Sequence, residues 1–193
     1  MEIWKEDENW AMPFDSPAYP RLPGRYHDTV LQLVYFTADP ETVARMLPAP
    51  LEAAKSGLCC AFAVDATFCA TYGPFKEVGV AVSCTYEGEE AFFLPCLFLT
   101  SSDAISPGRE IWGCPKKIAK ITMTQDGQEF TTTAVRADVP MIQLNSRITE
   151  PAKPEEVPSL WPMYLLKIMP DPEGVRPAVK QLVLNGELSD VTV

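Results

Sequence analysis

The stretch GREIWGCPKKIAKITMTQDGQEFTTTAVR, residues 108–136, gives the clearest indication of the fold. Its second half predicts a β-hairpin, because two runs rich in β-branched residues, 118–125 and 129–136, flank Asp126-Gly127, the strongest local turn signal in the chain. A turn punctuated by glycine and proline precedes the hairpin. Two adjacent lysines, Lys116 and Lys117, join that turn to the first strand.

Similar strand-like runs precede and follow this hairpin. Two of them, Val80–Tyr86 and Ala91–Leu99, predict a second hairpin, in which Pro95 must lie at a bulge or a sheet edge because it has no N–H to donate. The other runs are Val30–Thr37, Leu58–Thr71, Met141–Ile148, Tyr164–Met169 and Val179–Val193. Many short strands separated by turns predict a mainly β (α+β) protein. We expect an antiparallel sheet that closes into a cone-like β-barrel or packs as a double sheet, with a few short helices.

Helices play a small part in this prediction. Asp39, Pro40 and Glu41 supply a cap, a first-turn proline and an acidic residue, which predicts a short helix that stops at Pro48. Residues 1–25 are rich in proline and predict an irregular arm. With 193 residues and 47% hydrophobic content, the chain suits one domain over residues 1–193 with a sizeable core.

The composition excludes several functional classes. A net charge of −10 and a pI near 4.6 leave no basic stripe to neutralise phosphates, so we expect no nucleic-acid partner. No run of eighteen apolar residues occurs and the chain starts with charged residues, so we expect no membrane span, no signal peptide and a cytoplasmic location. Six cysteines without a C-x-x-C pair lie mostly in apolar runs, which predicts buried, reduced thiols.

The single histidine, His27, removes further possibilities. A zinc site built on two or three histidines cannot form, and no cysteine cluster replaces them, so we expect no metal. A Ser-His-Asp or Cys-His site would need His27 beside a nucleophile, and we expect instead an ordinary polar residue near a strand start. No glycine-rich nucleotide-binding motif is present, so no cofactor is expected. Lysine is the remaining nucleophile of consequence.

The lysines are concentrated in one place. The chain has nine, and three of them, Lys116, Lys117 and Lys120, fall within five positions beside apolar residues. Most adjacent lysine pairs are solvated surface charges, and composition alone favours that interpretation. A lysine among apolar neighbours, however, loses hydration of its ammonium group, so its pKa falls and the free amine becomes a nucleophile. Lowering a lysine pKa from about 10.4 to roughly 6–7 requires about 5–6 kcal/mol, which burial alone can supply.

Such an amine suggests imine chemistry. A neutral amine adds to a ketone and loses water, which leaves a protonated imine. That cation accepts the electron pair released when the neighbouring C–C bond to a carboxylate breaks, giving an enamine and carbon dioxide.

Strand geometry bears on which lysine reacts. Neighbouring side chains on an extended strand point to opposite faces, so Lys116 and Lys117 should not lie side by side. Lys117 shares a face with the apolar Ala119 and Ile121, whereas Lys116 shares one with Lys120. Alternation alone therefore favours Lys117 as the buried amine.

Residues 108–117 resemble the G-R-E-x-x-x-x-P-K-K signature of the acetoacetate decarboxylase family. Four further segments resemble landmarks of that family and follow in the family order along nearly the whole chain. They are Ser16–Pro20 (S-P-A-F-P in the family), Leu47–Glu52 (V-P-E-P-L-E), Tyr164–Pro170 (Y-M-L-K-I-I-P) and Ser189–Val193 (T-D-V-T-V). The resemblance implies a cone-like, antiparallel β-barrel around a lysine pocket and assembly as a homo-oligomer. It also implies that relatives continue with further strands beyond the position of Val193.

The resemblance assigns roles residue by residue. Lys116 becomes the nucleophile and Lys117 the adjacent catalytic lysine, because the proline before them or a bulge can shift the strand register. Glu77 resembles the active-site glutamate of the family's T-E-S-G turn, and its alternative is a solvated turn glutamate. Arg109 and Glu110 match the G-R-E element. They either bind substrate or form an internal ion pair that supports the turn.

Two positions depart from the family pattern. The family arginine in H-N-R-E, which is thought to meet the substrate carboxylate, is matched by Asp28, so Arg25, three residues earlier, is the candidate substitute. A second family glutamate falls on Ala63, with Asp65 nearby on the same strand face. These two departures argue against acetoacetate itself as the substrate. They do not affect the imine chemistry, which depends on the lysine.

Three functions follow as hypotheses. The first is a Schiff-base-forming carboxy-lyase that decarboxylates a small or medium 3-oxo acid through an imine on Lys116. The second keeps the imine and acts as an aldolase or dehydratase on a 2-oxo acid. The third is a non-catalytic barrel that binds an apolar ligand, with the lysines on its rim. In the first two hypotheses the partner is a small-molecule oxo acid.

Overall fold

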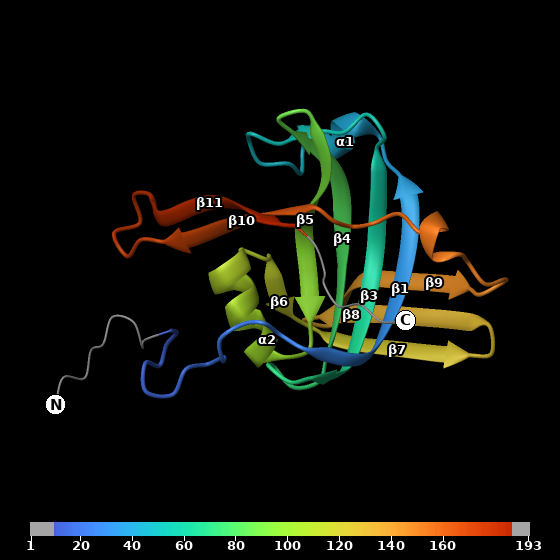
Figure 1. Ribbon diagram of the computed structural model, residues 1–193, viewed down its shortest axis with the longest axis horizontal. Helices are drawn as coiled ribbons and strands as arrows, with labels where there is room; N and C mark the ends of the chain where they lie inside the picture. The colour runs from blue at the N-terminus through green and yellow to red at the C-terminus, as the bar shows by residue number, and fades with distance from the viewer. Residues whose placement is uncertain (1–9, 187–193) are drawn as a thin grey trace.

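The computed structural model describes residues 10–186, and two β-sheets dominate it (Figure 1). The 8-stranded sheet, sheet A, has the order β1-β3-β4-β5-β10-β11, with β2 paired to β4 and β6 paired to β5. The 3-stranded sheet, sheet B, has the order β7-β8-β9. The strands are β1 (Tyr26–Thr37), β2 (Glu52–Ala53), β3 (Leu58–Cys69), β4 (Phe75–Tyr86), β5 (Glu89–Leu99), β6 (Lys116–Ile118), β7 (Lys120–Asp126), β8 (Glu129–Arg136), β9 (Val139–Arg147), β10 (Met163–Pro170) and β11 (Pro177–Asn185).

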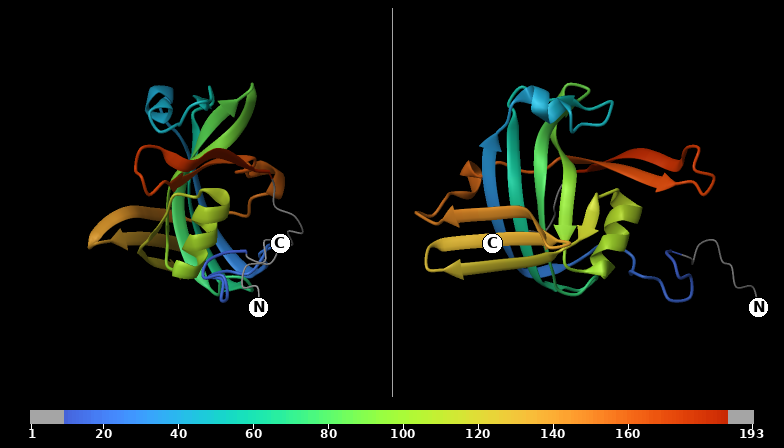
Figure 2. Two further views of the ribbon diagram at one scale, coloured as in Figure 1. Left: turned by 90° about the vertical axis from the view of Figure 1, so that its left-hand side faces the viewer. Right: turned by 180° about the vertical axis from the view of Figure 1, so that it is seen from behind.

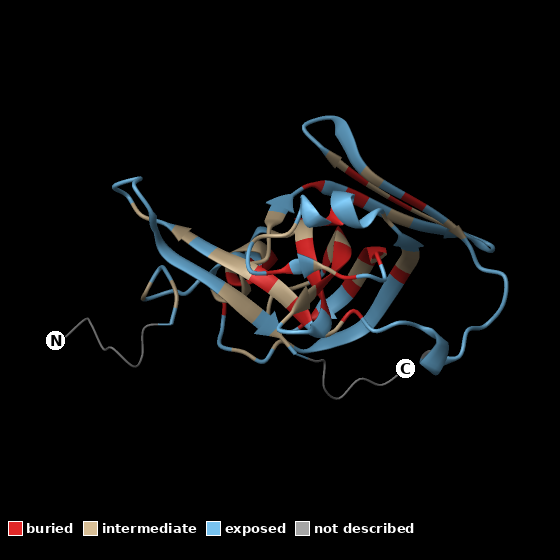
Figure 3. Cartoon of the chain, turned by 90° about the horizontal axis from the view of Figure 1, so that it is seen from above, coloured by how far each residue is buried: buried red, intermediate tan, exposed pale blue. Residues whose placement is uncertain are grey.

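The two faces of sheet A carry different parts of the core. One face packs against sheet B, where Ala63 and Val78 meet Ile121 and Leu144. The other face holds a second cluster that includes Phe62, Leu97 and Leu165. Figures 1 and 2 show sheet B crossing behind the long strands β1 and β3–β5, while β10 and β11 project from the sheet as a two-stranded ribbon. The buried residues accordingly gather where the layers overlap (Figure 3).

The predicted mainly β fold is confirmed as a double sheet with a few short helices. Sheet A does not close, since β1 and β11 lie at its two ends, and β5 pairs in parallel with both β6 and β10. Both predicted hairpins form. Gly127 adopts a left-handed φ of 57° at the tip of the first, as its turn requires. Pro95 lies at a bulge, because the β4–β5 register shifts between Val80 and Val82.

The helical segments match the prediction in one case and differ in another. Helix α1 (Pro40–Ala44) begins as expected, with the Asp39 carboxylate accepting a hydrogen bond from the Thr42 N–H at 3.0 Å. The predicted turn over 108–115 was wrong in its first part. Helix α2 (Ser102–Pro107) runs directly into a π-helical turn, η1 (Gly108–Trp112), which ends at Gly113 with φ 81°. Pro107 lacks an N–H, so the α-helical ladder cannot continue through it and gives way to a wider turn.

Several segments lie outside the two sheets. Residues 10–25 form no helix or strand, as the arm prediction required. A short 3₁₀ turn, η2, covers Pro154–Glu156. His27 is an exposed residue near the start of β1 whose ring contacts Phe68. The segment Ser189–Val193 lies outside the described residues. No helix in residues 10–186 is long and apolar enough to cross a membrane.

A buried polar group joins the edge strand β1 to sheet B. The Thr132 hydroxyl donates to Gln32 Oε1 at 2.6 Å, and Gln32 Nε2 donates to Ser146 Oγ at 2.8 Å. Thr132 is fully buried and Gln32 almost so. Because buried amides and hydroxyls are costly unless hydrogen-bonded, these contacts fix how the two sheets dock.

Replacing Thr132 by Val should therefore destabilise the protein. The change keeps the side-chain shape but leaves Gln32 Oε1 buried without its donor, which costs about 1–3 kcal/mol in the free energy of unfolding. Urea denaturation followed by circular dichroism measures this cost. Thr131→Val is the matched control, because Thr131 is partly exposed on the opposite face of β8 and should change stability little. Equal stabilities for the two variants would contradict the assigned role.

Candidate active site

Lys116 lies at the start of β6, where the chain leaves the η1 turn and pairs in parallel with β5. Its register partner is Leu97, which faces the cluster containing Phe62 and Leu165, whereas Lys117 is paired with Phe98 on the opposite face. The Lys116 side chain is only 12% exposed, and Lys117 is exposed. The inference from alternation, which favoured Lys117, assumed one continuous strand. The chain instead breaks at Ala119 as it passes from sheet A to sheet B.

Three groups from two elements, β4 and α2, surround the amine of Lys116. Nζ lies 3.5 Å from Glu77 Oε2 on β4 and donates a hydrogen bond to the Ala104 carbonyl of α2 at 3.2 Å. It also lies 5.8 Å from the centroid of the Phe75 ring, close enough for a cation–π contact. One carboxylate, one carbonyl and an aromatic face therefore form its surroundings.

Gly108 is required by the path of the Lys116 side chain. A Cβ at this position would lie 2.5 Å from Lys116 Cδ, 2.7 Å from Cε and 3.0 Å from Nζ, so the lysine side chain would have to move from its present path. The glycine of the G-R-E element thus leaves the slot in which the lysine lies between η1 and sheet A. The first residue of the motif positions the nucleophile through its missing side chain.

Glu77 is the carboxylate nearest the amine, and its environment is unusual. Its Oε2 atom is buried and accepts no hydrogen bond from the described residues. Its contact with Lys116 Nζ, at 3.5 Å, is an ion pair. Directly opposite Glu77 on β3 is the apolar Val64. Asp65, the candidate substitute for the family's second glutamate, pairs with Lys76 on the other face of the sheet, as alternation from Val64 requires. Glu77 is therefore not a solvated turn residue, and Asp65 does not join it.

Tyrosine and cysteine side chains near Glu77 were not predicted from the sequence. Burial raises the pKa of Tyr26 strongly, and the neighbouring Cys69, the Glu77 charge and Tyr72 raise it further. The Tyr26 ring also makes an edge contact with Phe75, at 6.3 Å between centroids. These residues come from positions far apart in sequence or at strand ends, where no motif marks them.

The other predicted site residues divide into two groups. Arg109 Nη1 donates a long hydrogen bond of 3.4 Å to the Lys116 carbonyl, so Arg109 lies beside the nucleophile. Glu110 accepts a 2.7 Å hydrogen bond from the buried hydroxyl of Tyr19, whose pKa is raised by burial and by that carboxylate. No ion pair between Arg109 and Glu110 forms in the described part of the chain, so the predicted internal pair is absent there. Arg25 is exposed, and its side chain makes no hydrogen bond or ion pair with residues 10–186.

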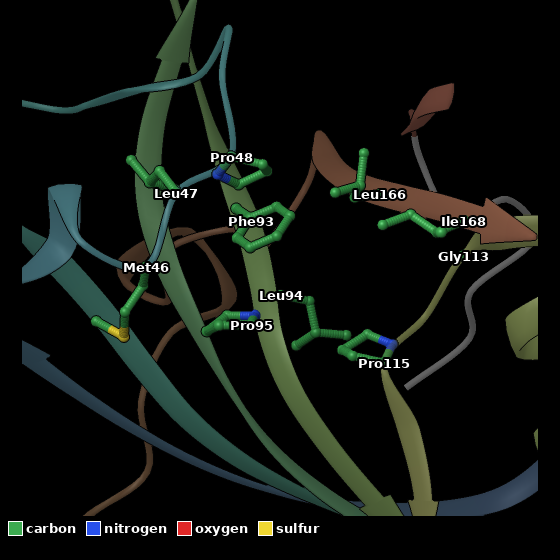
Figure 4. A pocket seen from close by; sticks show the side chains of 10 residues that line it. All are labelled: Met46, Leu47, Pro48, Phe93, Leu94, Pro95, Gly113, Pro115, Leu166 and Ile168. Carbon is green, nitrogen blue, oxygen red and sulfur yellow. The ribbon is translucent and has the colours of Figure 1, made fainter. Parts of the chain in front are cut away.

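Two hollows adjoin this region, and neither has Lys116 in its wall. One, of about 480 Å³, contains Arg109, Glu110 and Cys114 together with Ile105, Ser106, Gly113, Pro115, Leu166, Ile168, Met169 and Pro170. The other, of about 430 Å³, is lined by Met46, Leu47, Pro48, Phe93, Leu94, Pro95, Gly113, Pro115, Leu166 and Ile168 (Figure 4). In the residues that the structure describes, no group of three or more histidine, cysteine or carboxylate side chains is placed to hold a metal ion.

Cys114 lies between the amine and the hollow that contains Arg109. Burial raises the pKa of its thiol to about 11, while the Lys116 charge acts to lower it and the Glu77 charge to raise it. Its side chain also lines the hollow. Cys114 thus interacts with the charges of Lys116 and Glu77 and also forms part of the wall of the hollow.

Comparisons with known proteins identify relatives of the whole chain. A sequence profile described as "Acetoacetate decarboxylase (ADC)" matches residues 11–193. "Acetoacetate decarboxylase 1" of Bradyrhizobium diazoefficiens is 29% identical over 191 residues, which cover 95% of this chain and 74% of the relative. The crystal structure of acetoacetate decarboxylase from Legionella pneumophila superposes with a TM-score of 0.81 at 25% identity, covering 93% of this chain and 73% of that one.

A more distant structure shares the fold alone. The enduracididine biosynthesis enzyme MppR, solved in complex with the condensation product of pyruvate and imidazole 4-carboxaldehyde, superposes with a TM-score of 0.72 at 16% identity. It covers 91% of this chain and 75% of that one.

Alkylation of Cys114 tests the geometry of the cluster without reference to catalysis. Because its pKa is about 11, the thiol is protonated at neutral pH, and labelling by iodoacetamide should accelerate as the pH rises towards that value. Lys116→Met removes the charge that lowers the pKa and should slow labelling at pH 8. Glu77→Gln removes the charge that raises it and should speed labelling. Peptide mass spectrometry measures both, and shifts of the same sign would show that the thiol does not lie between the two charges.

Proposed function

The chain belongs to the acetoacetate decarboxylase family, and on this premise we propose that it is a Schiff-base-forming carboxy-lyase that decarboxylates a 3-oxo acid through an imine on Lys116. One observation carries the proposal: Lys116 and Glu77 form a pair, at 3.5 Å, among the apolar or aromatic side chains of Val64, Phe75 and Leu97. A lysine and one carboxylate, both mostly removed from water, are the minimum that imine catalysis requires.

The proposed steps use these two residues. Transfer of a proton from the Lys116 ammonium to Glu77 gives the neutral amine, which adds to the C3 carbonyl. The protonated Glu77 then returns that proton to the carbinolamine oxygen, which leaves as water. The protonated imine then takes up the electron pair of the C1–C2 bond, which releases carbon dioxide and leaves an enamine. A proton delivered to C2 and hydrolysis of the imine give the ketone and restore the amine.

The pairing of Glu77 with Lys116 supports its role in proton transfer. Glu77 Oε2 is buried and makes no hydrogen bond within residues 10–186, and Lys116 Nζ lies 3.5 Å from it as its ion-pair partner. A carboxyl group held this close to the amine can exchange a proton with a carbinolamine that forms on it.

Arg109 is the proposed receptor for the substrate carboxylate. It is the only cationic residue in the wall of the hollow beside Cys114, and it has no carboxylate partner among residues 10–186. Its guanidinium contacts the backbone carbonyl of Lys116 at 3.4 Å, so the proposed carboxylate site belongs to the same turn as the nucleophile. Lys117 and Arg25 are exposed and the Glu110 carboxylate accepts the Tyr19 hydroxyl, so the proposed steps use none of these three residues.

Reductive trapping tests the nucleophile. Incubation with acetoacetate or 3-oxohexanoate followed by borohydride should add mass to the Lys116 peptide, and carbon dioxide release should accompany it. Lys116→Met should lose the adduct and at least about 10⁴-fold of the rate, because no other described lysine lies beside Glu77. Lys117→Met, the matched control, should keep both to within about threefold. An adduct that stays in Lys116→Met and disappears in Lys117→Met would overturn the assignment.

The carboxylate receptor is tested by comparing two arginines. Arg109→Met should raise KM about tenfold to a hundredfold with a smaller change in kcat, because a charge-assisted contact made in both ground and transition states is lost. Arg25→Met should leave both constants nearly unchanged. Steady-state kinetics of carbon dioxide release measures the difference. The opposite ranking would move the carboxylate site to the start of β1.

The second hypothesis, an aldolase or dehydratase acting on a 2-oxo acid, uses the same imine. The fold neighbour MppR, whose structure contains a condensation product of pyruvate, supports keeping it. The two functions differ in outcome, since trapping with pyruvate but no carbon dioxide release from any 3-oxo acid would favour the second.

Other features implied by the family stay predictions. We propose a single domain over residues 1–193 that acts in the cytoplasm as a homo-oligomer. Exposed apolar residues on the edge strand β1, Val30 and Leu31 among them, support an assembled state, which light scattering of the purified chain measures.

A further inference from the structure

The two hollows next to the candidate site share one wall. Gly113 and Pro115 from the loop after η1, and Leu166 and Ile168 from β10, line both of them. Figure 4 shows Leu166 and Ile168 entering the apolar hollow from β10, with Pro115 below them and Phe93 on β5 facing them. The two hollows are therefore neighbours, and we refer to the pair as the depression; Cys114 lines the one that contains Arg109.

The chemistry of the depression changes from one end to the other. The end near Cys114 holds Arg109 and Glu110, and the Glu110 carboxylate is already occupied by the Tyr19 hydroxyl. The far end is formed by ten residues, none with a charged or hydrogen-bonding side chain. A cation at one end and hydrocarbon at the other match an acid with an apolar tail.

The size of the far end also argues against a four-carbon substrate. The hollow of about 430 Å³ is open towards solvent, with Met46 and Ile168 exposed on its walls, and it offers apolar surface well beyond the size of a single methyl group. Acetoacetate, with a single methyl group beyond its carbonyl, would leave this hollow unused.

We propose that the substrates are 3-oxo acids with a hydrocarbon tail of about four or more carbons, bound with the carboxylate at Arg109 and the tail in the hollow between Met46, Phe93 and Ile168. The reacting end of this proposal rests on the proposed function, since it requires the imine at Lys116. The tail site rests on the walls of the hollow alone. The two parts can therefore fail separately.

Binding of simple fatty acids tests the tail site without any chemistry. Calorimetric titration of the full chain with butyrate, hexanoate, octanoate and decanoate should show affinity rising about threefold to fourfold for each methylene until the hollow is full. Equal affinities for butyrate and octanoate would overturn the proposal.

Two variants place the tail within the hollow. Ile168→Asp puts a charge on the shared wall at an exposed position, so the fold should tolerate it, and it should weaken octanoate binding at least about tenfold while changing butyrate binding less than threefold. Met46→Asp, on the opposite wall, should weaken octanoate binding by a similar factor. Agreement between the two variants would show that the loss does not come from a local structural defect in one of them. Leu184→Asp is the matched control, because Leu184 is exposed on the same β10–β11 ribbon and lines neither hollow. Its binding should be unchanged, and an equal loss in all three variants would overturn the proposal.

Turnover measurements then distinguish failure of the tail site from failure of the proposed function. With 3-oxo acids of four, six, eight and ten carbons, kcat/KM for carbon dioxide release should rise with length and lose that rise in Ile168→Asp. Decarboxylation of acetoacetate with no preference for length would leave the proposed function standing and remove the tail site. Fatty-acid binding that depends on length, without trapping or carbon dioxide release from any oxo acid, would keep the tail site and remove the proposed function.

Discussion

The close contact between Gly108 and the side chain of Lys116 sets the geometry of the whole site. Helix α2 and the η1 turn lie so close to the lysine that a single added carbon at Gly108 would come within 2.5 Å of Cδ. The lysine is consequently held between the turn and sheet A, where the Ala104 carbonyl and the Glu77 carboxylate are the groups within reach. Packing thus confines the Lys116 side chain and offsets the rotamer entropy that a flexible side chain loses on burial. The contact with Glu77 is therefore not the sole constraint on its position.

Strand register then separates the charges of sheet A. Val64 pairs with Glu77 and Asp65 with Lys76, so consecutive positions on β3 face opposite sides. The Asp65–Lys76 ion pair therefore lies on the face away from Lys116, with the sheet between the two pairs. A slip of one residue would exchange them, so that Lys76 and Asp65 would face Lys116 in place of Glu77 and Val64. The long antiparallel pairing of β3 with β4 fixes the electrostatics of the site as well as the core.

The sequence allowed the strands, both hairpins and the Asp39 cap to be predicted, because periodicity and turn residues are local properties. It also allowed the family landmarks to be placed, and through them Lys116 and Glu77. Two local inferences failed in the same region: the glycines and the proline of residues 108–115 suggested a turn where the helical backbone continues to Trp112, and alternation was extended across the break at Ala119. The contact between Tyr19 and Glu110 spans 91 residues and has no local signature. The hollow could not be predicted either, since its walls come from four separate parts of the chain.

The N-terminal arm affects which charge of the G-R-E element is available to a ligand. Successive residues on a helical turn point about 100° apart, so Arg109 and Glu110 diverge although they are adjacent. At the family's S-P-A-F-P phenylalanine this chain has Tyr19, whose hydroxyl supplies a donor that a phenylalanine lacks. Because that donor occupies the Glu110 carboxylate at 2.7 Å, the carboxylate does not need Arg109 as a partner. Arg109 is thus left without a carboxylate partner among residues 10–186, which supports it as the proposed anion receptor although Asp28 stands where the family has its arginine.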